Sequence, residues 1–432
     1  MARIQTELEQ LKGLRWCFIA DSANSIFVGF TFAGPQFVLF LDFLGVSKLG
    51  IGALFSLLPL LGLSALVTLP TISRFGYKRT FLLFYFARKL IMAALLCTPL
   101  VIAALGSPIG FVFVGCVLAA FGLCRAVSET ALYPWSMEYI PLAVRGRFSA
   151  VDGILCSLSS LVATLTAGYV LNEFDDVTPF MILIVIGVMF GFVSVVAYSQ
   201  IPGGAPAWAS NQGRAEYFNF ALALENRKMQ RFLVGNSLML SVLAPMPVLT
   251  PLFYLNQVGL TSSQTVWSST AMFAGGLFAM FGWGYLADRF GGRPIMLWGV
   301  VLCCVLPLGW LCLPLQSATG FYLVLVMEAL HGAVIPAWSI GSAHYLFVNI
   351  IPGSEKGTMT ALFYAGSGIS SGISLLLSGW ILDYLSKIAP LTIARISIGL
   401  YTPFFVYMFG AAIVCFVILS KRNPDLSLVK GC

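Results

Sequence analysis

Twelve apolar segments, each of about 20 residues or more, dominate the sequence. A helix of that length crosses the ~30 Å hydrocarbon core of a bilayer, because an α-helix rises ~1.5 Å per residue. Only 9% of the residues are charged, whereas a soluble domain carries roughly 25%, so a soluble globular protein is excluded. The predicted spans are residues 14–40, 47–72, 80–104, 109–140, 147–171, 178–200, 232–256, 265–287, 294–314, 319–350, 357–384 and 396–420.

These spans are predicted to be helices rather than strands. A transmembrane strand alternates apolar and polar residues, and these segments show no such alternation. The 42 glycines suit helices that pack closely in lipid. Most of the ten cysteines lie singly in apolar segments, and none forms a C-x-x-C pair. We interpret them as small core residues and expect an all-α integral membrane protein with no metal site and no cofactor.

The positive charges lie mainly on one side of this topology. With both termini in the cytoplasm, 18 of the 24 Lys and Arg residues lie in cytoplasmic segments and three in outer loops. This distribution follows the positive-inside rule and explains the net charge of +7 without a nucleic-acid partner. We therefore expect a multi-pass protein of the inner or plasma membrane, in contact with lipid and monomeric, with both termini cytoplasmic.

The longest polar stretch, Pro202 to Arg231, lies between the sixth and seventh spans and divides the chain into halves. We predict one six-helix bundle over residues 1–200, a cytoplasmic linker over residues 201–231 and a second bundle over residues 232–432. Apolar residues among spaced charges predict a short interfacial helix between Glu216 and Arg231, and a plain solvated linker is the alternative.

The halves repeat each other at a nearly constant offset. Residues 74–78 (Arg-Phe-Gly-Tyr-Lys) match residues 289–293 (Arg-Phe-Gly-Gly-Arg) at an offset of 215. Residues 145–146 match residues 356–357, and residues 168–172 match residues 379–383, both at an offset of 211. Transporters place their binding sites between such repeats.

The segment 284–293, Gly-Tyr-Leu-Ala-Asp-Arg-Phe-Gly-Gly-Arg, resembles the loop signature of the major facilitator superfamily, as it recurs in the second half of such proteins. The resemblance implies two pseudo-symmetric six-helix bundles that rock about a central site lined by helices one, four, seven and ten. It also implies a cytoplasmic gate that includes Arg74, Gly76, Arg145, Asp288, Arg289, Gly291 and Arg293.

The first-half copy departs from this signature, because Ser73 stands where an acidic residue is expected and Pro70 and Thr71 replace small residues. The fifth helix, residues 150–171, also lacks the Gly-Pro element typical of the family's drug/proton antiporters. A drug or metabolite exporter is therefore an alternative rather than the main prediction.

Ionisable residues inside the membrane are costly, so each is a functional candidate. On the fourth helix Arg125 and Glu129 share one face. They either take part in substrate binding or gating, or form an internal ion pair with no other role. Arg88 and Lys89 on the third helix, together with Arg125, make the interior of the first half positive. That charge favours an anionic or zwitterionic solute.

The tenth helix carries Glu328 and His331 at i and i+3, a spacing at which they can share a proton, with Trp338 further along. We predict that Glu328 is the proton-coupling carboxylate; the alternative places Glu328 near the outer interface and His331 on a backbone carbonyl. On the first helix, Asp21 and Asn24 are further candidates. Asp21 either couples an ion or pairs with a cytoplasmic Arg.

The sequence has no H-E-x-x-H motif and no phosphate-binding G-x-x-x-x-G-K-[ST] motif, which are typical of metalloproteases and of nucleotide-driven proteins. Active transport would therefore draw on an ion gradient. We predict a secondary transporter, a symporter of a small organic solute with a proton as coupling ion. A membrane accessory or assembly protein that keeps the fold without transport is the alternative.

Overall fold

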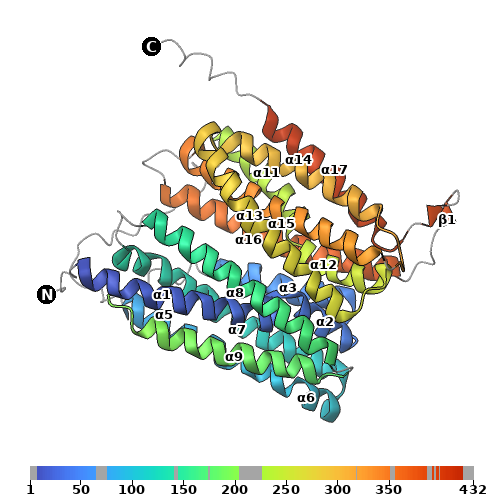
Figure 1. Ribbon diagram of the computed structural model, residues 1–432, viewed down its shortest axis with the longest axis horizontal. Coiled ribbons are helices and arrows are strands. Elements are labelled where there is room, and N and C mark those ends of the chain that lie inside the picture. Colours follow the sequence, from blue (N-terminus) through green and yellow to red (C-terminus); the bar gives the residue numbers. More distant parts are fainter. Residues whose placement is uncertain are drawn as a thin grey trace.

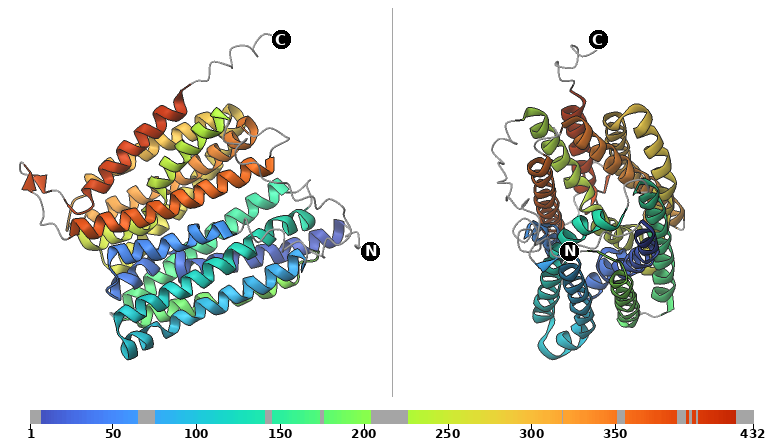
Figure 2. Two further views of the ribbon diagram at one scale, coloured as in Figure 1. Left: turned by 180° about the vertical axis from the view of Figure 1, so that it is seen from behind. Right: turned by 90° about the vertical axis from the view of Figure 1, so that its left-hand side faces the viewer.

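The computed structural model describes residues 7–64, 75–140, 145–173, 176–203, 226–317, 319–350, 356–386, 392–393, 396–397 and 399–421. Its helices form two bundles that lie side by side, one from the first half of the chain and one from the second (Figure 1). Two further views show the same division (Figure 2). The predicted linker helix over residues 216–225 lies outside the described residues, and residues 227–231 belong to the seventh span.

Six spans form the first bundle. A π turn interrupts the first span, a 3-10 turn follows the helix of the second, and a 3-10 turn interrupts the third. The fourth to sixth spans are continuous helices. In order they are α1 (Glu7–Val28) with a π turn (Gly29–Ala33) and α2 (Pro35–Phe43); α3 (Lys48–Leu61) with a 3-10 turn (Gly62–Ser64); α5 (Tyr77–Ala93) with a 3-10 turn (Ala94–Cys97) and α6 (Thr98–Leu105); α7 (Ser107–Tyr139); α8 (Arg145–Glu173); and α9 (Thr178–Ser199).

The second bundle repeats this order. Its seventh and tenth spans contain π turns, and two short strands precede its last helix. In order they are α11 (Arg227–Leu243) and α12 (Met246–Phe253) with a π turn (Tyr254–Val258); α13 (Ser262–Phe290); α14 (Gly292–Leu311); α15 (Gly320–His344) with a π turn (Tyr345–Ile350); α16 (Lys356–Ser386); the antiparallel pair β1 (Thr392–Ile393) and β2 (Ile396–Ser397); and α17 (Thr402–Ser420).

The twelve predicted spans are confirmed. Within the described residues, eleven helices are long and apolar enough to cross a membrane, and the shorter apolar helix at 48–64 supplies the second span. Several boundaries differ from the prediction by a few residues, and two of these differences have a clear local cause. The last helix begins at Thr402 rather than at 396, with Pro403 in its first turn, where proline favours helix initiation. The eighth begins at Ser262, because Thr261 and Gln264 form a capping box.

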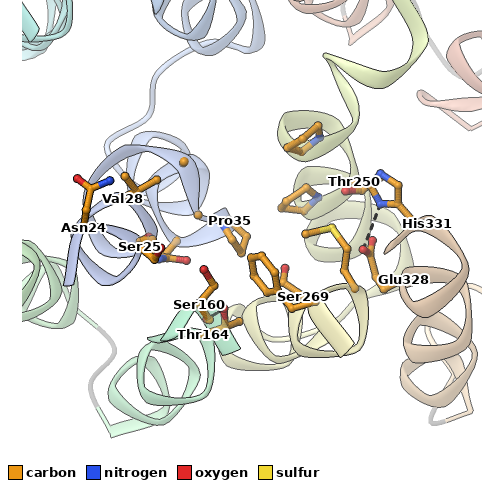
Figure 3. A pocket seen from close by; sticks show the side chains of 18 residues that line it. Asn24, Ser25, Val28, Pro35, Ser160, Thr164, Thr250, Ser269, Glu328 and His331 are labelled. Carbon is orange, nitrogen blue, oxygen red and sulfur yellow. Dashed lines mark hydrogen bonds and ion pairs between the residues drawn. The ribbon is translucent and has the colours of Figure 1, made fainter. Parts of the chain in front are cut away.

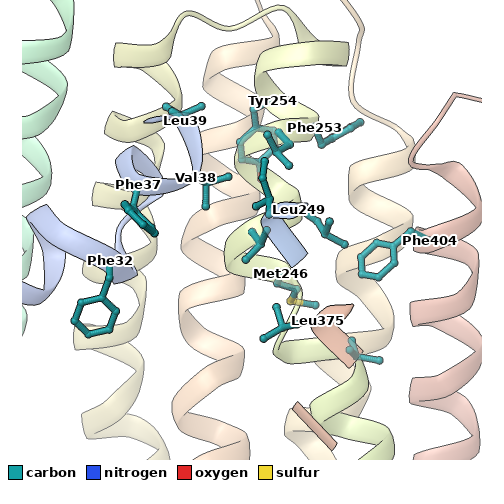
Figure 4. Packing of buried hydrophobic residues seen from close by; sticks show 14 of the residues in the cluster. Phe32, Phe37, Val38, Leu39, Met246, Leu249, Phe253, Tyr254, Leu375 and Phe404 are labelled. Carbon is teal, nitrogen blue, oxygen red and sulfur yellow. The ribbon is translucent and has the colours of Figure 1, made fainter. Parts of the chain in front are cut away.

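The core lies between the helices of both bundles. Buried aromatic and aliphatic side chains of α2, such as Phe37, lie near those of α12, such as Leu249 (Figure 4). Because lipid supplies no hydrophobic force between helices, close packing depends on small residues. At Gly332 of α15, an added Cβ would collide with the carbonyl oxygen of Met272 on α13. These two helices therefore pack backbone to backbone.

Candidate functional site

The relative position of the bundles differs between the two membrane faces. We call the face at which α1 begins and α17 ends the terminal face. Near the opposite face, α3 crosses α16 at Gly52 and Gly379, where an added Cβ on either glycine would collide with the other helix's backbone. The halves are therefore in direct contact at that crossing.

A second contact near the opposite face joins α8 to α13. The indole of Trp267 lies against Gly168, and its Nε1 donates to the carbonyl oxygen of Leu165 at 3.4 Å. One turn nearer the surface, Ser263 Oγ donates to Asn172 Oδ1 at 3.3 Å. The two crossings together close the opposite face.

Toward the terminal face, α8 and α13 carry glycines without close neighbours. Gly153 on α8 and Gly282 and Gly284 on α13 have no atom within 4 Å of the place that a Cβ would occupy, apart from their own chain neighbours. These three positions therefore make no close contact with the other half.

A cavity of about 440 Å3 lies between the two halves. Figure 3 shows side chains from both bundles entering it from opposite sides, with Asn24 and Ser25 on one side and Glu328 and His331 on the other. Glu328 and His331 are its only ionisable lining residues in the described part of the chain. The neutral polar lining residues are Asn24, Ser25, Gln36, Ser160, Thr164, Thr250 and Ser269.

Interrupted helices in corresponding positions of the two halves shape this cavity. The first span changes to a π turn at Gly29 and breaks at Gly34, before Pro35 starts α2. The seventh span breaks between α11 and α12 at Pro245. Paired interruptions of this kind are the structural signature of transporter binding sites, because irregular backbone at membrane depth is tolerated where it lines a cavity.

Glu328 is the centre of a buried polar chain in the second half. Its Oε1 accepts a hydrogen bond of 2.7 Å from the Tyr254 hydroxyl, and Tyr254 accepts one of 2.8 Å from Trp310 Nε1. Its Oε2 lies 3.3 Å from His331 Nδ1. Glu328 and His331 are 3% and 1% exposed. The sequence left open whether His331 contacts Glu328 or a backbone carbonyl. In the structure its Nδ1 contacts the Glu328 carboxylate.

The predicted pair on the fourth helix is formed. Arg125 Nε lies 2.7 Å from Glu129 Oε1, and Arg88 NH1 lies 3.7 Å from the same oxygen. The side chains of Arg125 and Glu129 are 37% and 51% exposed, so both are accessible to solvent, although neither is among the residues that line the cavity. Whether the pair binds substrate stays a prediction.

Asn24 lies between the cavity and two basic residues of α5. Its Oδ1 accepts hydrogen bonds from Lys89 Nζ at 2.6 Å and from Arg88 NH2 at 3.3 Å. The Lys89 ammonium, which is fully buried, also lies over the rings of Phe27 and Tyr85, at 3.5 and 4.4 Å from their centroids. Contact with aromatic faces stabilises this cation away from water.

Two other predicted site residues lie away from the cavity lining. Asp21 accepts a hydrogen bond from the Tyr198 hydroxyl of α9, rather than from a cytoplasmic arginine. Trp338 is 5% exposed, and its backbone contacts Gly299 of α14. Both residues therefore hold helices together within their own half.

The repeated loop signature has one role in both halves. Gly76 and Gly291 each adopt a positive φ, +92° and +83°, at the start of the following helix, a conformation that glycine adopts without strain. Two positions later, Lys78 Nζ donates to the carbonyl oxygens of Ser199 and Ile201 at 2.9 and 2.6 Å.

Arg293 is the counterpart of Lys78, and its NH2 donates to the carbonyl oxygens of residues 419, 420 and 421 at 3.0, 3.0 and 3.1 Å. In the state described here, Arg293 is thus bonded within its own half, and its role in a cytoplasmic gate stays a prediction. Arg289 is exposed, and its guanidinium lies 5.4 Å from the ring of its neighbour Phe290. Arg74 and the side chains of Arg145 and Asp288 lie outside the described residues.

Sequence reasoning missed the polar lining residues Gln36, Ser160, Thr164, Thr250 and Ser269, and also Tyr254 and Trp310, which form the hydrogen-bond chain to Glu328. Gln36 follows the Gly34–Pro35 break, which is a local signal for an irregular helix. Tyr254 and Trp310 carry no such signal, because an aromatic residue in an apolar span has the same appearance in the core and at a site.

Residues 231–430 match the family model described as Major Facilitator Superfamily. No curated protein matches the sequence. Among solved structures, nucleoside transporter NupG is similar, with a TM-score of 0.74 and 13% identity over 94% of this chain and 99% of that chain. A bacterial homologue of the lysosomal transporter Spinster, inward-facing and unoccupied, has a TM-score of 0.65 and 12% identity over 96% of each chain.

A bacterial homologue of the iron transporter ferroportin is informative because it is known in two states. Its inward-facing structure has a TM-score of 0.68, with 13% identity over 96% of this chain and 99% of that chain. An outward-facing structure has a TM-score of 0.61. At these identities the likeness concerns the fold alone. The second half of the chain thus matches the Major Facilitator Superfamily model, and nearly the whole chain shares its twelve-helix fold with solved transporter structures.

Proposed function

We propose that this transporter moves a small anionic or zwitterionic organic solute by alternating access, as a proton symporter in which Glu328 carries the coupling proton. The observation that supports the proposal is the position of Glu328 and His331, buried together at the wall of a cavity shared by both halves. The His331 imidazole, 3.3 Å from the Glu328 carboxylate, offers a second site for a proton at the cavity wall.

The charge distribution supports the solute class. Arg88, Lys89 and Arg125 all lie in the first half near the cavity, and Glu129 is the acidic partner that they share. The polar side chains in the cavity lining, Glu328 and His331 above all, favour transport over an accessory role, in which apolar side chains would fill the space between the bundles. Among the described residues, no group of three or more His, Cys, Asp or Glu is placed to hold a metal ion.

The proposed orientation places the terminal face in the cytoplasm of a cell whose inner or plasma membrane holds the protein, because the basic residues gather at that face. The structure then represents an inward-open state. The neighbours named for nucleosides and for iron carry different cargo, so no substrate is transferred from them to this chain.

Proton coupling can be tested in vesicles loaded with a pH-sensitive dye. Solutes of different classes, such as serine, succinate, uridine and glucose, are added outside under an imposed pH gradient. For the solute that moves protons, Glu328→Gln should still exchange labelled solute across the membrane, because the amide resembles the protonated acid, yet should fail to accumulate it. Glu173→Gln, an exposed carboxylate at the opposite face, is the matched control. Undiminished uphill uptake by Glu328→Gln would overturn the proposal.

A further inference from the structure

The cavity also carries information about the hydrogen-bonding character of its solute. Resting on the proposed function, we propose that the solute binds through a protonated amine and that Gln36 accepts a hydrogen bond from that amine. The inference starts from the Gln36 side chain, which is 3% exposed and lines the cavity. Its Oε1 has no hydrogen-bond partner among the described residues.

The π turn of the first span fixes the orientation of this amide. Gln36 Nε2 donates to the carbonyl oxygen of Gly29, the first residue of that turn. The opposite orientation would place two oxygens against each other, so the oxygen is the atom left free. Buried acceptors without a partner are uncommon in folded proteins. A donor on a bound solute would provide the missing partner.

Three hydroxyl groups of the cavity lining also present hydrogen-bond acceptors to a solute. Ser25, Thr164 and Thr250 each donate their single hydrogen to the carbonyl oxygen four residues earlier in their own helix, at 2.9, 2.7 and 2.9 Å. A hydroxyl that has donated its hydrogen in this way offers only lone pairs to a ligand. These three residues come from both halves, so acceptors face the cavity from two sides.

The charged groups point to the same class of solute. Glu328 lines the cavity and, when ionised, only accepts hydrogen bonds. Lys89 and Arg88 are buried and bonded to Asn24, so they contribute positive charge to the first half without contacting the solute directly. An ammonium group has three donors and no acceptor, which matches an acceptor-rich wall.

The class can be tested with four five-carbon compounds that differ only in their end groups: cadaverine, 5-aminovalerate, glutarate and 1,5-pentanediol. The full chain is purified in detergent, and its thermal unfolding is followed against the concentration of each compound, because a ligand of the folded state raises stability. We expect saturable stabilisation by the two amines and none by glutarate or pentanediol. Stabilisation by glutarate, or by none of the four, would overturn the amine assignment.

Variants of Gln36 test the residue itself. Gln36→Met keeps the length of the side chain without the acceptor and should weaken amine binding by about 10-fold or more, as expected for a lost hydrogen bond to a charged group. Both Gln36→Met and Gln36→Glu lose the hydrogen bond to Gly29. Gln36→Glu keeps two acceptor oxygens, however, so it should bind the amines at least as tightly as the wild type. Gln257→Met, a glutamine outside the cavity lining, is the matched control.

Equal losses in Gln36→Met and Gln36→Glu would show that the residue acts only by holding the π turn, and would overturn its binding role. These results are independent of proton coupling. Binding of glutarate in place of the amines would overturn the amine assignment and leave the proposed function in place, whereas uphill uptake by Glu328→Gln would overturn the proposed function and leave amine binding standing.

Discussion

Lys78 and Arg293 occupy equivalent positions in the two halves, and each donates hydrogen bonds to the carbonyl oxygens at the end of the last helix of its own bundle. The last carbonyls of a helix have no partner within that helix, and they carry the negative end of its dipole. A cation placed there satisfies the carbonyls and stabilises the dipole. The basic residue of the loop signature therefore joins the third helix of each bundle to the sixth.

The first prediction is that Arg293→Gln destabilises the second bundle. The variant loses a charge-assisted contact with three carbonyl oxygens at the end of α17, and we expect a loss of about 1–2 kcal/mol in the free energy of unfolding. Denaturant or thermal unfolding in detergent measures this change. Arg289→Gln is the control, since Arg289 is exposed and lies beside its own neighbour Phe290. Equal stability of both variants would contradict the capping role.

The second prediction concerns the packing that positions Glu328 and His331. Gly332→Ala places a methyl group against the carbonyl oxygen of Met272, so α15 must move away from α13. Because overpacking a tight contact costs about 1–3 kcal/mol, we expect lower thermal stability together with impaired uptake. In Gly410→Ala of α17 the added methyl group meets no atom within 4 Å, and this variant should behave as the wild type.

The third prediction concerns the pair on the fourth helix. Arg125→Lys keeps the charge but loses the planar arrangement of donors, and we expect weaker solute binding at normal expression, because Arg125 is part-exposed and its partner Glu129 also neighbours Arg88. The measurement is the concentration dependence of uptake in vesicles. Wild-type transport by the Arg125→Ala, Glu129→Ala double variant would show that the pair has only a structural role.

Much of the fold could be predicted from the sequence, because helix length and apolar character are dictated by the bilayer. The twelve spans and the repeat follow from that constraint. The start of the last helix could not be predicted in the same way. Residues 396–401 are apolar enough to continue a helix, but the chain forms the β1–β2 pair at 392–397 and starts α17 only at Thr402.

The site was predictable only where charge marked it. Glu328 and His331 stand out as ionisable groups inside a span, and their 3.3 Å contact follows from helical spacing. Tyr254 is different, because its role depends on a contact between elements far apart in the chain, the bond from Tyr254 to Glu328. No local pattern encodes which residues of two distant helices meet.

The last prediction tests the closed contact at the opposite face. Ser263 on α13 donates to Asn172 on α8, across the boundary between the halves. Cysteines at these two positions should be joined by a short bifunctional thiol reagent in the state described here. Since alternating access requires that this contact open, the joined protein should lose uptake and regain it when a reductant cleaves the bridge.

Joining of the halves can be read on a gel after cleavage at a protease site inserted between residues 203 and 226, because only a bridged protein keeps its two halves together. The wild type treated in parallel accounts for native thiols such as Cys97, Cys116 and Cys312, which are exposed. A control pair, Gly153→Cys with Gly284→Cys, lies on the same two helices toward the terminal face, where neither position has a neighbour within 4 Å. This pair should react little in the absence of solute. Full uptake by the bridged Asn172→Cys, Ser263→Cys protein would mean that the two halves move without separating at this contact.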